Sequence, residues 1–220
     1  MSPLLVELVG PAGAGKSALQ QALLAETPGA ANGHSLWNQD RLALARGALR
    51  VTPAALAAAR GGKPLVPPEM GQMVRLEAME RTLPKITGGR RLIVMDEGPV
   101  FALSWFDVFF GRNGDPGWSA WRRRMVSTWS AKLDAIVRVD ADDAVLAQRI
   151  NSRAKQHMMK QQPYPEVCGF NARFRDAFDR VTGEMVKAGN VKVFDLRTDE
   201  RRPDELVRQL SEMIETSRGR

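Results

Sequence analysis

Three glycines, a lysine and a serine stand close together near the N-terminus, in the stretch GPAGAGKS at residues 10–17. Glycines let successive backbone N–H groups face one point, where they can bind phosphate oxygens. Lys16 could hold the outer phosphates of a nucleotide, and the Ser17 hydroxyl could ligate Mg²⁺. The spacing G-x-x-x-x-G-K-S therefore predicts a phosphate-binding loop, called the phosphate loop below. The residues expected to bind the nucleotide are Gly10, Pro11, Ala12, Gly13, Ala14, Gly15, Lys16, Ser17 and Ala18.

Two adjacent carboxylates, Asp96 and Glu97, follow an apolar run at 92–95. At the end of a strand beside the phosphate loop, a carboxylate can hold Mg²⁺ or take a proton from an acceptor hydroxyl. Neighbouring residues on a strand point to opposite faces, so we expect one of the two to face the phosphates directly. Asp96 is the candidate metal ligand together with Ser17, and either acid is a candidate base. A hydrated acidic pair at a strand end is the alternative.

Two arginines, Arg149 and Arg153, lie four residues apart and share one face of an expected helix. Cations at this point could close over the phosphates and stabilise the charge that develops on a transferred phosphoryl group. The alternative is a solvated basic face. His34 and His157 have no cysteine or histidine near them in the sequence, so they do not predict a metal centre.

Alternating strands and helices must position these residues, which predicts an α/β fold with a parallel sheet and right-handed crossovers. The expected strands are 4–9, 33–39, 92–95, 135–140 and 191–196. The expected helices are 16–26, 40–60 with an interruption at Pro53, 69–83, 100–110, 118–132, 141–156, 170–187 and one that begins at Pro203. We expect loops at 61–68 and a flap at 157–168.

The composition limits the classes of partner and compartment. The chain has 220 residues, of which 44% are hydrophobic, enough for one substantial core. Its net charge of +7 favours anionic partners, but the basic residues are scattered, so we do not expect nucleic acid to be a partner. A single cysteine, Cys168, fits a reducing compartment. We expect a cytoplasmic protein with no membrane partner, since neither a signal peptide nor a run of membrane-spanning length is evident.

Four segments together resemble the P-loop small-molecule kinases, in particular the thymidylate kinase-like and deoxynucleoside kinase-like branch. They are GPAGAGKS at 10–17, LIVMDEGP at 92–99, IVRVDADDAVLAQRINSRAK at 136–155 and VKVFDLRTDE at 191–200. The resemblance covers nearly the whole chain. It implies a single domain over 1–220 with a three-layer P-loop NTPase fold, a five-stranded parallel sheet and an arginine-bearing lid at about 149–168. It also implies ATP and Mg²⁺ as cofactors and a carboxylate, Asp96 or Glu97, that orients or deprotonates the acceptor.

One departure from that family concerns the acceptor. Its members usually carry an arginine directly after the strand-end acid, where this chain has Glu97 and Gly98. The arginine that would neutralise the phosphate of a nucleotide acceptor is therefore missing from its usual place, so a neutral or cationic hydroxyl compound is an alternative to a nucleoside monophosphate. The candidate acceptors are nucleosides, nucleotides and other hydroxyl metabolites. We expect the acceptor site in the least family-like segments, which are 34–41, the helix around Arg75 and an aromatic cluster. The cluster consists of Phe101, Trp105, Phe106 and Trp121, and core packing is the alternative role for it. The candidate contacts of the acceptor are Trp37, Asp40, Arg41 and Arg75.

The sequence thus predicts a kinase that transfers the γ-phosphate of ATP to a small-molecule acceptor. The alternative is a nucleotide-binding switch, or slow NTPase, that acts through a protein partner. Phosphorylation of nucleic-acid ends is a third hypothesis. The sequence lacks the guanine-reading N-K-x-D motif of many switches. A homodimer is a further expectation.

Overall fold

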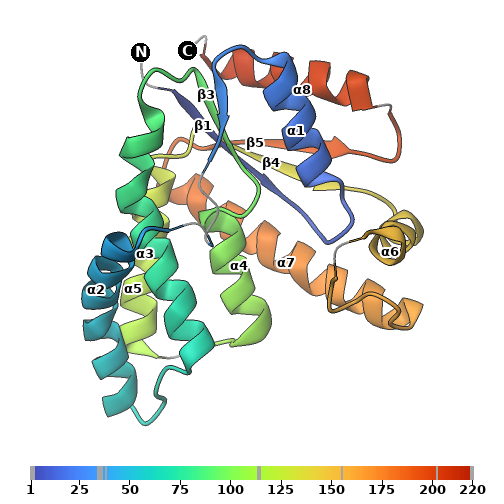
Figure 1. Cartoon of the computed structure of the whole chain (residues 1–220). Coiled ribbons are helices and arrows are strands. Elements are labelled where there is room, and N and C mark those ends of the chain that lie inside the picture. The colour runs from blue at the N-terminus through green and yellow to red at the C-terminus, as the bar shows by residue number, and fades with distance from the viewer. Residues whose placement is uncertain are drawn as a thin grey trace.

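Five parallel strands form the central sheet of the chain (Figure 1). The computed structural model describes residues 3–33, 37, 39–112, 115–154, 156–201 and 203–218. The strand order is β2-β3-β1-β4-β5. The strands are β1 (Leu4–Val9), β2 (Ala30–Asn32), β3 (Leu92–Met95), β4 (Ala135–Asp140) and β5 (Lys192–Arg197). The prediction of an α/β fold with a five-stranded parallel sheet is confirmed.

Helices cover both faces of the sheet, which explains why its inner strands are almost continuously apolar. On one face, Val6, Leu8 and Val137 pack against α1 and α8. On the other face, Leu5, Val9 and the helices α4 and α7 belong to the larger core. The helices are α1 (Lys16–Glu26), α2 (Arg41–Arg60), α3 (Pro67–Thr87), α4 (Pro99–Phe109), α5 (Pro116–Ser130), α6 (Asp143–Ser152), α7 (Tyr164–Ala188) and α8 (Pro203–Arg218).

Helices α2, α3 and α5 form a bundle beside the sheet and extend past its carboxyl edge (Figure 1). Within the described residues, α2 is the helix that is long and apolar enough to cross a membrane by length and composition. It packs against α3 and α5 as a helix of this domain.

The second strand lies earlier in the chain than predicted. β2 covers Ala30–Asn32 and pairs with β3, so the prediction of a strand at 33–39 is wrong. A three-residue edge strand of small residues carries no apolar alternation that would reveal it. Of the predicted range, 34–36 and 38 lie outside the described residues.

The predicted bounds of three helices differ from the observed ones because of prolines. α2 continues through Pro53, because Pro53 and Leu49, whose carbonyl the proline cannot bond, both lie on the exposed face. α3 begins at Pro67 and α7 at Tyr164, with prolines in their first turns, where no intrahelical N–H bond is lost. The connection between α6 and α7 is consequently confined to 153–163, shorter than the flap expected at 157–168 and the lid expected at about 149–168.

Candidate functional site

The phosphate loop joins β1 to α1 and is held tightly by its neighbours. Gly10, Gly13 and Gly15 have φ angles of 152°, 83° and 89°, which side chains rarely adopt. A Cβ on Gly10 would lie 1.9 Å from the carbonyl oxygen of Val139, and one on Gly13 would lie 2.7 Å from that of Leu146. The loop can therefore approach β4 and α6 this closely only with glycine at both positions.

The first turn of α1 offers its N–H groups to a ligand. The residue before the helix is Gly15, which has no side chain to cap them, and the first turn contains no acidic residue. The unpaired N–H groups and the positive end of the helix dipole favour an anion here. Ser17 and Ala18 are exposed at this end of α1, as a phosphate contact requires.

The Lys16 side chain folds back along the phosphate loop. Its ammonium donates hydrogen bonds to the carbonyl oxygens of Gly10 at 2.8 Å and Pro11 at 3.1 Å. Burial lowers the pKa of Lys16, whereas the negative charges of Asp96 and Glu97 oppose this effect. The cation therefore lies between the loop and the two carboxylates that follow β3.

Ser17 and Asp96 meet across the gap between α1 and the end of β3. The Ser17 hydroxyl donates to Oδ2 of Asp96 at 2.5 Å. The other oxygen, Oδ1 of Asp96, is buried and has no hydrogen-bond partner among the described residues. A hydroxyl and a carboxylate with an unpaired oxygen are the hard oxygen ligands that Mg²⁺ takes alongside phosphates and water. Ser17 and Asp96 thus fit the predicted metal site.

Arg149 is anchored between the phosphate loop and the segment after β5. Its guanidinium donates to the carbonyl oxygen of Gly13 at 3.4 Å and to the Thr198 hydroxyl at 2.8 Å. The same hydroxyl donates to the carbonyl oxygen of Ala14 at 2.9 Å. Thr198 was not among the predicted site residues, because a lone threonine after a strand carries no sequence signal.

Arg153 and His157 bring positive and titratable groups near Lys16. Arg153 caps the C-terminus of α6, and its charge lowers the pKa of Lys16. The pKa of His157 is lowered chiefly by burial and further by the charges of Arg153 and Lys16. The ring of His157 lies 5.9 Å from that of Phe170 on α7. His157, which the sequence did not mark as a site residue, therefore belongs to the surroundings of Lys16, and His34 lies outside the described residues.

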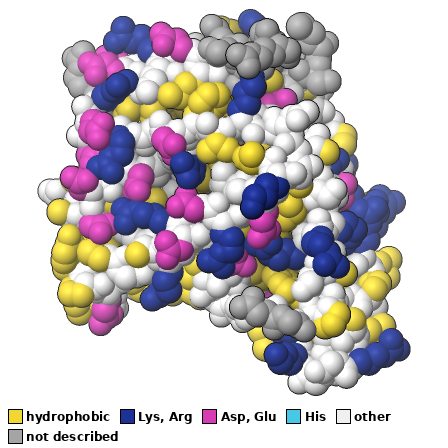
Figure 2. All heavy atoms as spheres, turned by 180° about the vertical axis from the view of Figure 1, so that it is seen from behind, with side chains coloured by type: hydrophobic (Ala, Val, Ile, Leu, Met, Phe, Trp, Pro, Cys, Tyr) yellow, Lys and Arg dark blue, Asp and Glu magenta, His cyan; other side chains and the backbone are white. Residues whose placement is uncertain are grey.

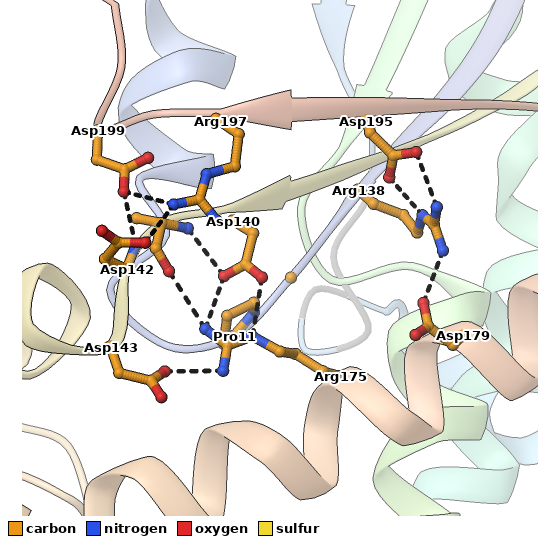
Figure 3. Close-up of polar contacts among 12 residues, drawn as sticks. Pro11, Arg138, Asp140, Asp142, Asp143, Arg175, Asp179, Asp195, Arg197 and Asp199 are labelled. Atoms are coloured by element: carbon orange, nitrogen blue, oxygen red, sulfur yellow. Dashed lines mark hydrogen bonds and ion pairs between the residues drawn. The ribbon is translucent and has the colours of Figure 1, made fainter.

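A group of charged residues at the ends of β4 and β5 joins α6 to α7, the two helices on either side of the 153–163 connection (Figure 3). Arg175 of α7 donates to both carboxylate oxygens of Asp140, at 2.8 and 3.0 Å, and to Asp143 of α6 at 2.7 Å. Figure 3 places Pro11 of the phosphate loop beside this guanidinium. Arg175 therefore ties α6 and α7 to the strand that supports the loop.

Two of the four predicted acceptor contacts, Trp37 and Arg75, lie against each other. Trp37 is 57% exposed, and the guanidinium carbon of Arg75 lies 4.7 Å from the centre of its ring. Asp40 instead caps α2 by accepting the Ala43 N–H at 2.7 Å, and it pairs with Lys85 at 2.8 Å. Arg41 is exposed at the start of α2.

Trp37 contacts Arg75 and Asp40 contacts Lys85, and these two partners lie at different heights along α3. Lys85 is ten residues beyond Arg75, about 15 Å along the helix. The structure therefore separates Trp37 and Arg75 from the contacts of Asp40.

An apolar wall follows the Asp96–Glu97 turn. Phe101 of α4 stacks on Phe174 of α7 with ring centres 6.3 Å apart, and Phe170 of α7 also contacts His157. Phe101 and Trp105 are partly buried, so this wall is not sealed from solvent. Phe174 belongs to the larger core, and Phe101 packs against that core.

Solved structures resemble the chain in fold, although no family model and no curated protein sequence matches it. Deoxyadenosine kinase from M. mycoides, solved with dCMP and dCDP as products, aligns with a TM-score of 0.55 and 11% identity, over 97% of this chain and 100% of that one. Thymidylate kinase from Candida albicans aligns with a TM-score of 0.59 and 12% identity, over 99% and 93% of the two chains. Shikimate kinase from Bacteroides thetaiotaomicron aligns with a TM-score of 0.52 and 14% identity, over 96% and 98%. The chain has the fold of the P-loop small-molecule kinases.

Proposed function

We propose that the chain is a phosphotransferase that moves the γ-phosphate of ATP to a small-molecule acceptor. One observation carries the proposal: Ser17 of the phosphate loop meets Asp96 at 2.5 Å, and the second oxygen of Asp96 is buried without a described partner. Lys16 lies beside this pair. If Asp96 served only to accept the Ser17 hydrogen bond, its buried Oδ1 would be expected to have a partner of its own. In a metal-nucleotide site, a carboxylate oxygen of this kind is available to ligate the metal.

The residues around the phosphate loop would have different roles in phosphoryl transfer. The loop N–H groups and Lys16 would bind the phosphates, and Ser17 with Asp96 would hold the metal. Mg²⁺, when bound, neutralises charge on the outer phosphates. The charge of Arg153, which acts on Lys16, would also stabilise charge on the phosphoryl group as it transfers. Arg149 would keep the loop in place through Gly13 and Thr198.

We assign the role of base to Glu97, because Asp96 already bonds to Ser17. In the transfer step, an acceptor hydroxyl oxygen forms a bond to the γ-phosphorus while the bond from that phosphorus to the bridging oxygen of ADP breaks. The hydroxyl proton passes to the Glu97 carboxylate. Glu97 lies close enough to Lys16 for its charge to raise that pKa, which supports a position beside the phosphates.

The acceptor is a small molecule whose hydroxyl reaches the Asp96–Glu97 turn. The wall of Phe101 and Phe174 favours an acceptor with a flat or apolar part. Arg75 and Trp37 lie together on the side of α3 and are the remaining candidates for a polar contact. The similar structures act on different classes of acceptor, since they include kinases named for deoxyadenosine, thymidylate and shikimate.

The test is a screen of nucleosides, nucleoside monophosphates, sugars and other hydroxyl compounds with ATP and Mg²⁺. Binding is read from thermal stabilisation, because a ligand that binds the folded state raises its melting temperature. Transfer is read from the mass of the product. A product heavier by one phosphoryl group is expected, and its formation should require both Mg²⁺ and Lys16. ATP binding with no product from any acceptor would favour a nucleotide switch.

A further inference from the structure

A glutamate stands in the middle of the central strand, among apolar residues. Glu7 of β1 pairs with Met95 of β3 and Ile136 of β4, and its side chain is 0% exposed. No described lysine, arginine or histidine forms an ion pair with it. Burying an acid without a cation is costly unless its oxygens accept hydrogen bonds. The contacts of this carboxylate therefore indicate its role.

The Glu7 carboxyl group caps α4 from outside that helix. Oε2 accepts the N–H of Val100 at 3.0 Å, and Oε1 accepts the N–H of Phe101 at 2.9 Å. These belong to the first turn of α4, whose preceding residue, Gly98, has no side chain to cap them. Pro99, the first residue of α4, has no N–H. A capping side chain normally bonds the second or third N–H of a helix, and here the strand supplies that group.

Gly98 is shaped to admit this carboxylate. A Cβ on Gly98 would lie 2.7 Å from the carboxyl carbon of Glu7 and 2.8 and 2.9 Å from its oxygens. The φ of Gly98 is −101°, which any residue adopts, so the glycine serves the close approach and not an unusual backbone angle. Glu7 and Gly98 therefore form a matched pair.

We infer that Glu7 is a positioning residue for the Asp96–Glu97 turn. The ladder pair with Met95 holds the start of this turn, and the bonds to Val100 and Phe101 hold its end. The three residues 96–98 join Met95 to the first turn of α4, and Glu7 holds both ends of this segment. Asp96 is thereby held opposite Ser17. The inference rests on the proposed function, since it gives Glu7 the task of placing the carboxylate that meets the metal.

A complementation series tests this role. Glu7→Ala removes the cap, and Gly98→Ser alone introduces a clash with the carboxylate. The double variant, Glu7→Ala with Gly98→Ser, should restore the cap, because the serine hydroxyl occupies the vacated space and can accept the same N–H groups. The two changes should be strongly non-additive, as expected for groups in contact. Glu77→Ala is the matched control, since Glu77 is equally buried but bonds to Trp121 and Arg124 away from the turn.

Two readouts separate positioning from simple stabilisation. The first is hydrogen exchange of residues 96–101, which should quicken about tenfold in Glu7→Ala and return toward the wild-type rate in the double variant. The second is the ratio of ATP dissociation constants without and with Mg²⁺. That ratio should fall about tenfold in Glu7→Ala, recover in the double variant and stay unchanged in Glu77→Ala.

The outcomes distinguish the two claims. Unchanged exchange in folded Glu7→Ala would overturn the inference, and so would quickened exchange with an unchanged Mg²⁺ ratio. Absence of ATP binding in the wild type would instead overturn the proposed function, and the exchange data would still decide whether Glu7 holds the turn. If Glu7→Ala does not fold, Glu7→Gln, which keeps one acceptor oxygen, is compared with the wild type by the same two readouts without the Gly98→Ser rescue.

Discussion

At the scale of single residues, the site depends on a few groups whose contacts differ in kind. Lys16 and the Ser17–Asp96 pair lie at the phosphate loop itself. Arg149 is held by hydrogen bonds, whereas Arg153 acts on Lys16 through its charge. These differences lead to distinct expectations for their variants.

Replacement of the loop lysine should remove transfer without unfolding the chain. Lys16→Ala loses the cation that would hold the outer phosphates, and we expect transfer to fall roughly hundredfold or more. Among the described residues, its ammonium bonds to two loop carbonyls, so the circular dichroism spectrum and the melting temperature should stay near those of the wild type. Near-normal transfer by this variant would mean that the loop does not bind the phosphates as described.

The two arginines should differ in the kinetic constant that they affect. Arg149→Ala removes bonds to Gly13 and Thr198 that hold the loop, so KM for ATP should rise about fivefold with little change in kcat. Arg153→Ala should lower kcat on the order of hundredfold, because the charge would act on the transferred phosphoryl group. Steady-state kinetics of both variants provide the test. The reverse division would contradict the roles assigned to them.

At the scale of elements, one buried acid links β1 to α4 and makes the stability of the fold depend on pH. Burial raises the pKa of Glu7 to about 8 from its ordinary value of 4.5, although the N–H groups of Val100 and Phe101 oppose the shift. The folded chain thus binds the Glu7 proton more tightly than the unfolded chain. Its stabilising contribution is complete below pH 4.5 and is lost as the pH rises through about 8.

This linkage can be measured against a variant that does not titrate. The free energy of unfolding of the wild type, relative to that of Glu7→Gln, should fall by at most about 1.4 kcal/mol per pH unit across this window. Chemical denaturation at a series of pH values gives both curves. Parallel curves for the two proteins would show that Glu7 does not retain its proton in the fold.

The junction of α6 and α7 provides a second expectation at this scale. Arg175→Met removes the bonds to Asp140 and Asp143, so hydrogen exchange of α6 should quicken and KM for ATP should rise severalfold. The pairs are partly exposed, so the melting temperature should change little. Arg180→Met on the same helix is the control, because Arg180 is more exposed and pairs only with Asp107 among described residues. Equal effects of the two variants would contradict the tie between α6, α7 and β4.

The elements that the sequence predicted well are those with a strong local pattern. β1, β3 and β4 are apolar runs, and α1 follows the glycines of the phosphate loop. β2 was not predicted at Ala30–Asn32, because the strand is short and shows no alternation of apolar and polar residues. The starts of α3 and α7 were obscured by prolines, which mark a loop or a first helical turn equally well.

The candidate site also contains residues that the sequence predicted and residues that it did not. The pairing of Ser17 with Asp96 follows from motifs that sit at the carboxyl ends of neighbouring strands. Thr198, His157 and Glu7 could not be found in the sequence, because each gains its place from a contact with a segment far away in the chain.

At the scale of the whole molecule, most of the charge on one face is balanced locally. Figure 2 shows Lys and Arg side chains mixed with Asp and Glu over much of that face. Arg138 pairs with Asp179 and Asp195, and Arg197 pairs with Asp142 and Asp199. These ion pairs offset part of the net charge of +7.

The basic residues are scattered along the sequence, which predicts weak interaction with nucleic acid. A single-stranded or duplex oligonucleotide should not bind measurably at low salt, where phosphate contacts are strongest. Fluorescence anisotropy with a labelled oligonucleotide is the measurement. Tight binding with a steep dependence on salt would instead support phosphorylation of nucleic-acid ends.

The central claim is that this fold transfers phosphate and does not merely hydrolyse a nucleotide. The most direct measurement compares the ADP formed with the phosphorylated acceptor formed, in the same reaction, for the acceptor that stabilises the protein most. A phosphotransferase forms one phosphorylated acceptor for each ADP, with little ADP when the acceptor is omitted. Steady ADP formation that is independent of every acceptor would contradict the central claim and would identify a nucleotide hydrolase with the fold of a kinase.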